Sequence, residues 1–447
     1  MLLQKPAFLL FYHTRAAEAS FGEWLGVLWH GLSLDCTVAG YVTAFPVVVV
    51  LASFWIPLSQ RVWRIILTVY FSLIALVTAA IFAVDLNLYG YWGFRLDGSV
   101  LIYLADPGEA LASASWGEVL RQILIMLVYA GAMIWSYRRI LPLFRVEPVS
   151  LRGRIVPTVA ALLIGGLTFL AIRGGVTVAT ANVSKVYFSS NMFLNHAATN
   201  PVFSFLSSVG DNENYAEAYP FFEEERRKTL FEELRGNRPG ADAGTPRLLR
   251  SDRPNVVLIL LESFGRTIMD ETVNGEPVMP NMQRFKREGV WFENFFANSF
   301  RTDRGQVAVL CGFPAQTTMS IMKLPRKSAT LPSLARSLGR EGYRSAFMYG
   351  GDLNFTNQAS FMYSTGWEKL IWQKDMQLDA PTSKWGYADD VVVDLFGDEV
   401  EALGREERPF LAGLLTLSSH EPFEVPFAKF DDKLLNAMAF SLSLIHI

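Results

Sequence analysis

Hydrophobic residues divide the chain into an apolar first part and a mixed second part. Four apolar runs in the first part have the length of a membrane span: Cys36–Pro57, Trp63–Val84, Val119–Tyr137 and Ile155–Ile172. Each is close to the roughly 20 residues that a helix needs to cross a bilayer. The shorter run Met1–Tyr12 has no clean signal-peptide cleavage site after it, so we interpret it as a first helix. The pattern predicts about five transmembrane helices in residues 1–173.

Basic residues between these runs predict the orientation. Arg61 and Arg64 lie between the second and third spans, and five more arginines lie between the fourth and fifth: Arg138, Arg139, Arg145, Arg152 and Arg154. Short loops rich in arginine stay in the cytoplasm. Five spans that start inside would then place the chain after Arg173 outside the membrane.

Residues 174–253 form a predicted connector. Its segment Val186–Leu206 is amphipathic rather than spanning, and we expect it along the outer membrane face. Within it, His196 is interpreted as a capping or interfacial histidine rather than a metal ligand. The pattern next predicts a charged, solvated helix at Glu217–Arg235 and a flexible Gly- and Pro-rich linker at 236–246.

The remaining chain alternates strand and helix patterns. We predict strands at Asn255–Ser263, Tyr343–Gly351 and Phe410–His420, with a strand or sheet edge at Val290–Asn298. Helices are predicted at Pro280–Gly289, Leu331–Gly342 and Ala388–Leu403. This alternation is typical of an α/β domain with a mostly parallel sheet. The fold class that we expect is therefore a multi-span helical membrane domain followed by an extracytoplasmic α/β domain.

Three polar residues stand where such a sheet collects functional groups. Glu262 ends the first strand, His420 ends the last, and Thr302 begins a predicted helix between Arg301 and Arg304. A hydroxyl between cations at a helix N-terminus suits a nucleophile that attacks a phosphate-like group. Glu262 and Thr302 could share one divalent metal, which would lower the pKa of the hydroxyl, and His420 could bind or protonate the leaving group. From spacing alone, a cap or an ion pair remains an open alternative for Glu262, and a cap for Thr302.

Composition agrees with this division. The chain is 51% hydrophobic and 19% charged with a mean hydropathy of +0.23, which lies between soluble and fully embedded proteins. A net charge of -3 without a sustained basic face argues against nucleic-acid binding. Cys36 and Cys311 have neither disulfide nor metal-site spacing.

Several motifs spread over nearly the whole chain carry a family resemblance. They are GLSLD, FLNHAATNP, NVVLILLESF, FRTDRG, GFPAQ, MYGGDLNF and TLSSHEPF. The chain resembles the sulfatase-like phosphoglycerol transferases, the lipoteichoic acid synthase family of the alkaline phosphatase superfamily. The resemblance implies a sulfatase-like domain at 254–440.

The resemblance also implies roles for individual residues. Glu262 matches the metal-binding glutamate, Thr302 the metal-bound nucleophile that carries a covalent intermediate, and His420 the substrate-site histidine. We further predict substrate contacts from Arg301, Arg304 and Asp352. The implied cofactor is one divalent ion, manganese or magnesium rather than zinc, in keeping with hard oxygen ligands.

The implied activity is a phosphoglycerol transfer at the bacterial inner membrane. The donor would be phosphatidylglycerol, the acceptor a hydroxyl of a glycan or glycerophosphate polymer, and the catalytic domain would be periplasmic. Alternatives are a phosphoethanolamine transferase or phosphodiesterase of the same superfamily, or a membrane scaffold with a degenerate site. A sulfatase would need a modified Cys or Ser in a motif that Thr302 does not provide.

The chain departs from the family pattern in two places. After the Gly-Gly turn it has Thr356 and Gln358 where the Gram-positive members have Trp and Arg, so it looks closer to the osmoregulated-glucan type of Gram-negative members. The family also completes its metal site with a downstream Asp-His pair, and His446 lacks the preceding Asp. We expect the domain to be incomplete at its C-terminus. We also expect residues 441–447 to be an artefactual tail, because LSLIHI matches a translated transposon-end sequencing adapter.

Overall fold

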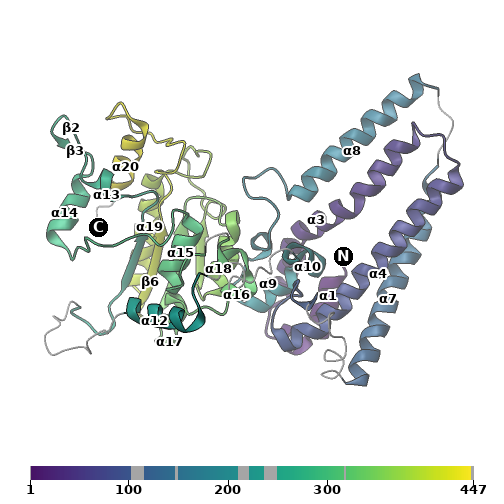
Figure 1. Ribbon diagram of the computed structural model, residues 1–447, viewed down its shortest axis with the longest axis horizontal. Coiled ribbons are helices and arrows are strands. Elements are labelled where there is room, and N and C mark those ends of the chain that lie inside the picture. Colours follow the sequence, from purple (N-terminus) through teal and green to yellow (C-terminus); the bar gives the residue numbers. More distant parts are fainter. Residues whose placement is uncertain are drawn as a thin grey trace.

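The computed structural model describes residues 2–101, 115–145, 150–209, 221–235, 249–316 and 319–443. A bundle of long helices and an α/β domain lie end to end along the longest axis, with short connector helices between them (Figure 1). Within the described ranges, four helices are long and apolar enough to cross a membrane. They are α3 (Phe21–Ser53), α4 (Gln60–Trp92), α7 (Trp116–Ile140) and α8 (Ile155–Arg173).

Local sequence signals set the ends of these helices. Ser20 and Ser115 begin α3 and α7 with capping boxes completed by Glu23 and Glu118. Gly174 ends α8 in the left-handed conformation (φ 85°) that glycine adopts without strain. Only 6% and 11% of the most apolar windows of α7 and α8 are buried, so their side chains are available to lipid.

The helix α3 extends well past the end of α8. Thr37 in α3 donates a hydrogen bond from Oγ1 to the carbonyl of Ala171, close to the last turn of α8 (3.0 Å). The preceding half of α3, Phe21–Cys36, therefore projects beyond α8 by about 24 Å at 1.5 Å per residue. The connector helices pack against this projecting half.

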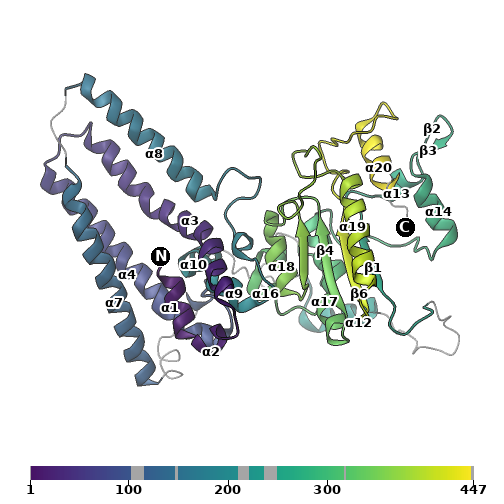
Figure 2. The same ribbon diagram turned by 180° about the vertical axis from the view of Figure 1, so that it is seen from behind.

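The expected first span at Met1–Tyr12 is wrong. The helix there, α1 (Gln4–Phe11), has 8 residues, which is too short to cross a membrane, and the short α2 (His13–Ala16) follows it. The side chain of Phe8 is fully buried, and Lys5 forms an ion pair with Asp35 of α3 (2.6 Å). Because α1 lies at the end of the bundle that meets the α/β domain (Figure 2), the expectation that the N-terminal helix starts on the opposite side is also wrong.

The connector is buried rather than spread along a membrane face. Its helices α9 (Met192–Ala198) and α10 (Pro201–Ser208) pack against α3 and α4, and every residue of Phe193–Ala198 is buried. Asn191 and Asn200 cap the two helices there, because their side chains accept hydrogen bonds from the first backbone N–H groups of α9 and α10. The expected charged helix is present as α12 (Glu224–Arg235), with Lys228 paired to Glu224 (2.8 Å). The expected linker at 236–246 lies outside the described residues.

The α/β domain contains the predicted parallel sheet. Its strand order is β1 (Val256–Leu260), β6 (Phe410–Leu415), β4 (Arg344–Tyr349) and β5 (Lys369–Trp372), with all neighbours parallel. One face of the sheet packs on α15 (Thr302–Cys311), α17 (Leu334–Arg340) and α18 (Gln358–Ser364). The other face packs on α19 (Asp389–Gly404) (Figure 2). Alternate residues of β4 make the two cores, with Phe347 on one side and Ala346 and Met348 on the other.

Most of the expected elements of this domain are present. The three predicted strands correspond to β1, β4 and β6, and the predicted helices to α14 (Pro280–Glu288), α17 and α19. The strand expected at Val290–Asn298 is wrong: the segment is an irregular exposed loop, in which Phe295 and Phe296 are 77% and 83% exposed. Aromatic residues favour strands, but this segment pairs with neither edge of the sheet.

A smaller cluster closes the end of the domain farthest from the bundle. It contains α13 (Arg266–Met269), the short hairpin of β2 (Thr272–Val273) and β3 (Glu276–Pro277), and α20 (Lys433–Ser443). Met279 and Met438 are fully buried in its core. Residues 444–447, which include His446, lie outside the described residues.

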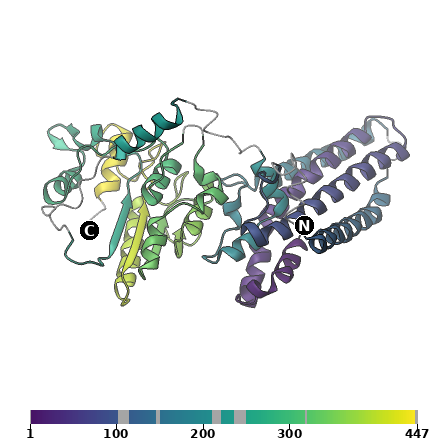
Figure 3. The ribbon, with the colours of Figure 1, turned by 60° about the horizontal axis from the view of Figure 1, so that its bottom comes forward.

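The connector joins the two parts by direct contacts (Figure 3). Asn182 donates from Nδ2 to the carbonyl of Asn354 (2.8 Å), and the backbone N–H of Ser360 donates to Oγ of Ser184 in η3 (Val183–Val186; 3.0 Å). These bonds fix the membrane-proximal side of the α/β domain against the connector.

Candidate active site

Glu262 and Thr302 meet at the carboxyl edge of the sheet. Glu262 follows β1, and Thr302 Oγ1 donates a hydrogen bond to Glu262 Oε2 across 40 positions of sequence (2.8 Å). The neighbouring strand holds the backbone of Glu262: its N–H donates to Thr416 Oγ1 (2.9 Å), and its carbonyl accepts from Ser419 Oγ (2.6 Å). The predicted proximity of the two side chains is therefore present in the structure.

The electrostatic surroundings of Thr302 favour an anion. Thr302 is the first residue of α15, so it stands at the positive end of the helix dipole. The guanidinium groups of Arg301 and Arg304 lie 5.8 Å and 6.0 Å from the ring centre of Phe300, which is 88% exposed. Arg301 and Arg304 stand one residue before and two residues after Thr302 in the sequence, so this end of α15 carries two cationic side chains in addition to the helix dipole.

The donor set can be compared with the needs of a divalent ion. Glu262 and Thr302 offer two hard oxygen atoms 2.8 Å apart, which suits manganese or magnesium better than a soft metal. In the part of the chain that the structure describes, no group of three His, Cys, Asp or Glu side chains could hold a metal. The oxygen atoms of Glu262 and Thr302 therefore suit a divalent ion, but they make up only part of its coordination set.

His420 lies at the same edge with one ring nitrogen engaged. Its Nδ1 is 2.9 Å from the carbonyl oxygen of Glu421, and because a carbonyl only accepts, Nδ1 carries the proton. In the neutral ring, Nε2 is then the basic nitrogen. Ser419 ties this turn to Glu262, but no contact among the described residues joins His420 directly to Thr302.

Trp385 is a site residue that the sequence analysis missed. Its ring centre lies 4.3 Å from that of His420, its Nε1–H donates to the carbonyl of Glu421 (2.8 Å), and Phe355 packs on its edge (5.6 Å). The one signal in the sequence was the Gly350–Gly351 pair after β4. A Cβ at Gly351 would lie 2.8 Å from the carbonyl of Trp385, so only glycine lets this loop approach.

Asp352 shapes its own turn in the structure, and its predicted contact with substrate stays a prediction. Its Oδ1 accepts from the backbone N–H of Asn354 (2.9 Å), which shapes the turn after β4. No hydrogen bond or ion pair among the described residues links it to Thr302. Burial raises the pKa of Tyr349, and the charges of Glu262, Asp389 and Asp352 raise it further.

Asp389 is a second residue that the sequence analysis did not single out. Its side chain is 2% exposed, and it accepts hydrogen bonds from the N–H groups of Leu417 (2.7 Å) and Ser418 (3.1 Å) and from Ser441 Oγ (2.6 Å). Burial raises the pKa of this carboxyl, and the hydrogen bonds oppose the shift. Asp389 thereby fixes the backbone that leads from β6 to His420.

Sequence comparisons match this domain to known proteins. Residues 254–439 match the Sulfatase family model. Phosphoglycerol transferase I of Xanthomonas axonopodis pv. citri (strain 306) is 33% identical over 181 residues, which cover 38% of this chain and 26% of that protein. Lipoteichoic acid synthase 1 of Bacillus subtilis (strain 168) is 30% identical over 191 residues, covering 38% and 27%. The chain thus spans about a quarter of the length of the curated relatives it matches.

Two solved structures are also similar. A protein in the alkaline phosphatase superfamily from Vibrio parahaemolyticus is 29% identical, covering 43% of this chain and 48% of that one with a TM-score of 0.40. Lipoteichoic acid synthase LtaP from Listeria monocytogenes is 20% identical, covering 43% and 50% with a TM-score of 0.41. Residues 254–439 therefore match the sulfatase family and are similar to phosphoglycerol transferases and lipoteichoic acid synthases, and within the described ranges four helices apolar enough to cross a membrane precede them.

Proposed function

We propose that the chain is a membrane-bound transferase that moves phosphoglycerol from phosphatidylglycerol to an acceptor hydroxyl of a glycan or glycerophosphate polymer. The observation that carries the proposal is the 2.8 Å hydrogen bond from Thr302 to Glu262 at the N-terminus of α15. The names of the relatives support the same chemistry. The assignment of Thr302, His420, Arg301, Arg304 and Asp352 to catalysis and substrate binding is part of this proposal.

The chain's own residues supply each part of the reaction. Glu262 orients the Thr302 hydroxyl and takes its proton as the bond from Oγ1 to phosphorus forms. The bond from phosphorus to the diacylglycerol oxygen breaks, and protonated His420 gives that oxygen a proton from Nε2. The acceptor hydroxyl then attacks the phosphorus and transfers its proton to the now neutral His420. The bond from phosphorus to Thr302 Oγ1 breaks, and Glu262 returns its proton to that oxygen. Arg301 and Arg304 hold the charged phosphate oxygens throughout.

A divalent ion would be held by Glu262 and Thr302. The sulfatase and alkaline phosphatase superfamily generally uses such a metal, and when bound it supplies Lewis acidity that lowers the pKa of the hydroxyl. Manganese or magnesium is the proposed ion because both donors are oxygen.

We further propose that the α/β domain lies outside the bacterial inner membrane, in the periplasm. The start of α4, which carries Arg61 and Arg64, and the end of α7, which carries Arg138 and Arg139, lie at the end of the bundle away from this domain (Figure 1). The positive-inside rule assigns that end to the cytoplasm. The proposed divisions are a membrane domain at 1–173, a connector at 174–253 and a catalytic domain at 254–440.

Replacing the nucleophile tests the function. The Thr302→Ala variant should release diacylglycerol from phosphatidylglycerol at least about 10³-fold more slowly than the wild type in detergent micelles with Mn²⁺, because the attacking oxygen is gone. Thr302→Ser should retain part of the rate, and Arg405→Gln, at the opposite end of the sheet, should retain all of it. Undiminished release by Thr302→Ala would refute the mechanism.

The rival interpretation is a membrane scaffold with a degenerate site. The described residues offer a metal the oxygen atoms of Glu262 and Thr302, but no cluster of three His, Cys, Asp or Glu side chains. This small number of metal donors favours the scaffold interpretation. Metal content separates the two interpretations: about one manganese or magnesium ion per chain, lost in Glu262→Gln, supports the transferase. A lipid panel that includes phosphatidylethanolamine would detect a phosphoethanolamine transferase or phosphodiesterase instead.

A further inference from the structure

A cavity of about 560 Å³ lies where the bundle, the connector and the α/β domain meet. The segment after α4, the connector and the loops beside α15 and α18 all contribute to its lining. Arg301, the neighbour of the proposed nucleophile, stands on its wall. The cavity therefore extends from the membrane bundle to the edge of the candidate active site, and its volume is typical of small-molecule sites.

The cavity is lined by an excess of positive charge. Five basic residues from both parts of the molecule lie on its wall: Arg95, Arg301, Lys323, Arg326 and Lys327. The wall carries one carboxylate, Asp97, and Arg326 pairs with it (3.1 Å). Apolar side chains such as Phe94, Phe203 and Leu324 complete the lining. The combination suits a ligand with an anionic group and an apolar part.

Two buried side chains in this lining have polar atoms without a partner. Arg95 and His196 are each 5% exposed. Within the described part of the chain, Nε and Nη1 of Arg95 and Nε2 of His196 form no hydrogen bond. A buried polar group left without a partner costs about 1–3 kcal/mol, more when it is charged. Such groups are stable in a fold when a ligand or ordered water supplies the missing partner.

The neighbours of Arg95 and His196 hold both side chains in place. Arg95 stacks on the Phe8 ring (4.3 Å) and pairs through Nη2 with Asp85 (3.0 Å). The hydroxyl of Tyr89 lies 3.1 Å from Nδ1 of His196. With Tyr89 donating to Nδ1, Nε2 of the neutral ring carries a proton and is a donor. Two residues of the cavity lining thus hold three preorganised N–H groups that have no partner in the described part of the chain.

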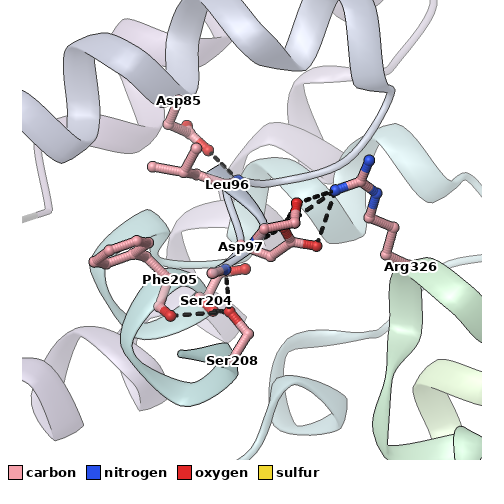
Figure 4. A network of polar contacts seen from close by, with 9 residues as sticks. Asp85, Leu96, Asp97, Ser204, Phe205, Ser208 and Arg326 are labelled. Atoms are coloured by element: carbon pink, nitrogen blue, oxygen red, sulfur yellow. Dashed lines mark hydrogen bonds and ion pairs between the residues drawn. The ribbon is translucent and has the colours of Figure 1, made fainter. Parts of the chain in front are cut away.

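Polar contacts of Leu96, Asp97 and Gly98 hold the loop that carries Arg95 (Figure 4 labels Leu96 and Asp97). The N–H of Leu96 donates to Asp85 Oδ1 (2.8 Å), and that of Gly98 donates to Ser208 Oγ (2.8 Å). Two residues beyond Arg95, Asp97 accepts from Arg326 of the α/β domain. The position of the α/β domain is therefore coupled to the loop that orients the guanidinium group of Arg95.

We propose that this cavity binds the phosphodiester headgroup of an anionic phospholipid, with its phosphate at Arg95 and His196. The choice of phosphatidylglycerol as the lipid rests on the proposed function. The lipid enters from the bundle, its glycerol and first acyl carbons contact the apolar wall, and the cavity delivers it towards Arg301 and Thr302. Arg95 and His196 are binding residues here and take no part in the chemical step.

Binding can be measured apart from turnover. The full chain carrying Thr302→Ala is titrated by calorimetry, in detergent with EDTA, with short-chain phosphatidylglycerol, short-chain phosphatidylcholine and inorganic phosphate. Phosphatidylglycerol should bind, and the paired substitution Asp85→Asn with Arg95→Gln should raise its Kd at least about tenfold without leaving a buried charge unpaired. Lys323→Gln and Lys327→Gln, both at exposed positions, should each raise it about twofold to threefold. Arg405→Gln should not change it.

Each outcome bears on the proposal. A Kd for phosphatidylglycerol that is the same in the Asp85/Arg95, Lys323, Lys327 and Arg405 variants overturns it, as does equal binding of phosphatidylcholine. Inorganic phosphate that displaces the lipid at equal concentration would identify the ligand as free phosphate and overturn the lipid assignment. Headgroup binding by the Thr302→Ala chain, together with a wild-type chain that releases no diacylglycerol, would refute the proposed function while supporting the cavity, so the two failures are distinguishable.

Discussion

At the scale of single residues, burial controls the charge state of His196. The side chain is 5% exposed, and burial, with the charges of Arg95 and Arg15, lowers its pKa from 6.5 to about 3. The ring is therefore neutral in the folded protein at neutral and mildly acidic pH. A neutral ring suits its position, because a second positive charge beside Arg95 would have no counterion.

This shift makes the stability of the fold depend on pH. The unfolded histidine binds a proton below about pH 6.5 and the folded one only near pH 3, so stability is fully present above pH 6.5 and falls as the pH drops through this window. Between pH 7.5 and pH 5.0 the wild type should lose about 2 kcal/mol that His196→Gln does not lose. Thermal unfolding in detergent at the two pH values measures the difference. Equal losses in both proteins would exclude His196 as the titrating group.

At the scale of elements, the end of β4 positions the aromatic side of the candidate site. Gly350 and Gly351 let the Trp385–Tyr387 loop approach the strand, where the N–H of Tyr387 donates to the carbonyl of Gly350 (3.0 Å). This approach places Trp385 against His420 (4.3 Å). The strand end therefore acts on the histidine indirectly: its backbone contacts position the Trp385–Tyr387 loop, and the Trp385 ring packs on His420.

Adding a methyl group at Gly351 should disturb this arrangement. In Gly351→Ala the new Cβ would meet the carbonyl of Trp385 at 2.8 Å and the Tyr349 ring at 2.7 Å, so we expect a loss of about 1–3 kcal/mol and slower turnover. The control is Gly397→Ala in α19, where no atom lies within 4 Å of the added Cβ and a gain of about 0.5–1 kcal/mol is expected. Chemical denaturation of both variants measures these changes in the free energy of unfolding. A Gly351→Ala protein as stable as the Gly397→Ala protein would contradict the packing argument.

The sequence predicted elements with strong periodicity and missed features that depend on tertiary contact. β1, β4, β6 and α19 follow from local patterns, and Glu262 and Thr302 could be paired because each stands at a strand end or helix start. β5 has four residues and no distinctive alternation, so its pattern was too short to recognise. Trp385 reaches the site because its backbone can approach Gly351, which has no side chain. The burial of α9 depends on the projecting half of α3, which hydropathy does not report.

At the scale of the whole molecule, a small set of contacts couples the membrane bundle to the α/β domain. Arg326 bonds Asp97 (3.1 Å) and Ser99 Oγ (2.6 Å) and lies over the Trp92 ring (4.4 Å). The arginine and the aspartate are 39% and 21% exposed, so the pair contributes at most about 1 kcal/mol. Because this pair is weak, the Asp97–Ser99 loop can separate from the α/β domain without unfolding either part.

Hydrogen exchange can detect this opening. In Arg326→Gln the loop Asp97–Ser99 loses its contact with the α/β domain, and amide exchange there should become about 3–10-fold faster, as expected for a loss of roughly 1 kcal/mol. Peptides from β4 and β6 should exchange at the wild-type rate. Mass spectrometry of the full chain in detergent gives both values, with Arg405→Gln as the control. An unchanged rate at Gly98 and Ser99 would show that Arg326 does not hold the junction.

The length of α3 sets how far a lipid must travel to react. In the proposed orientation its first half, Phe21–Cys36, stands above the hydrocarbon, and the α/β domain meets the bundle at that height. A phospholipid whose phosphate reaches Thr302 therefore has to rise partly out of its leaflet. Each methylene exposed to water costs about 0.8 kcal/mol, and the apolar wall of the junction cavity would offset part of that cost. The protein would thus raise a phospholipid partly out of its leaflet. A donor lipid with shorter acyl chains would be easier to extract, because fewer methylene groups would be exposed to water.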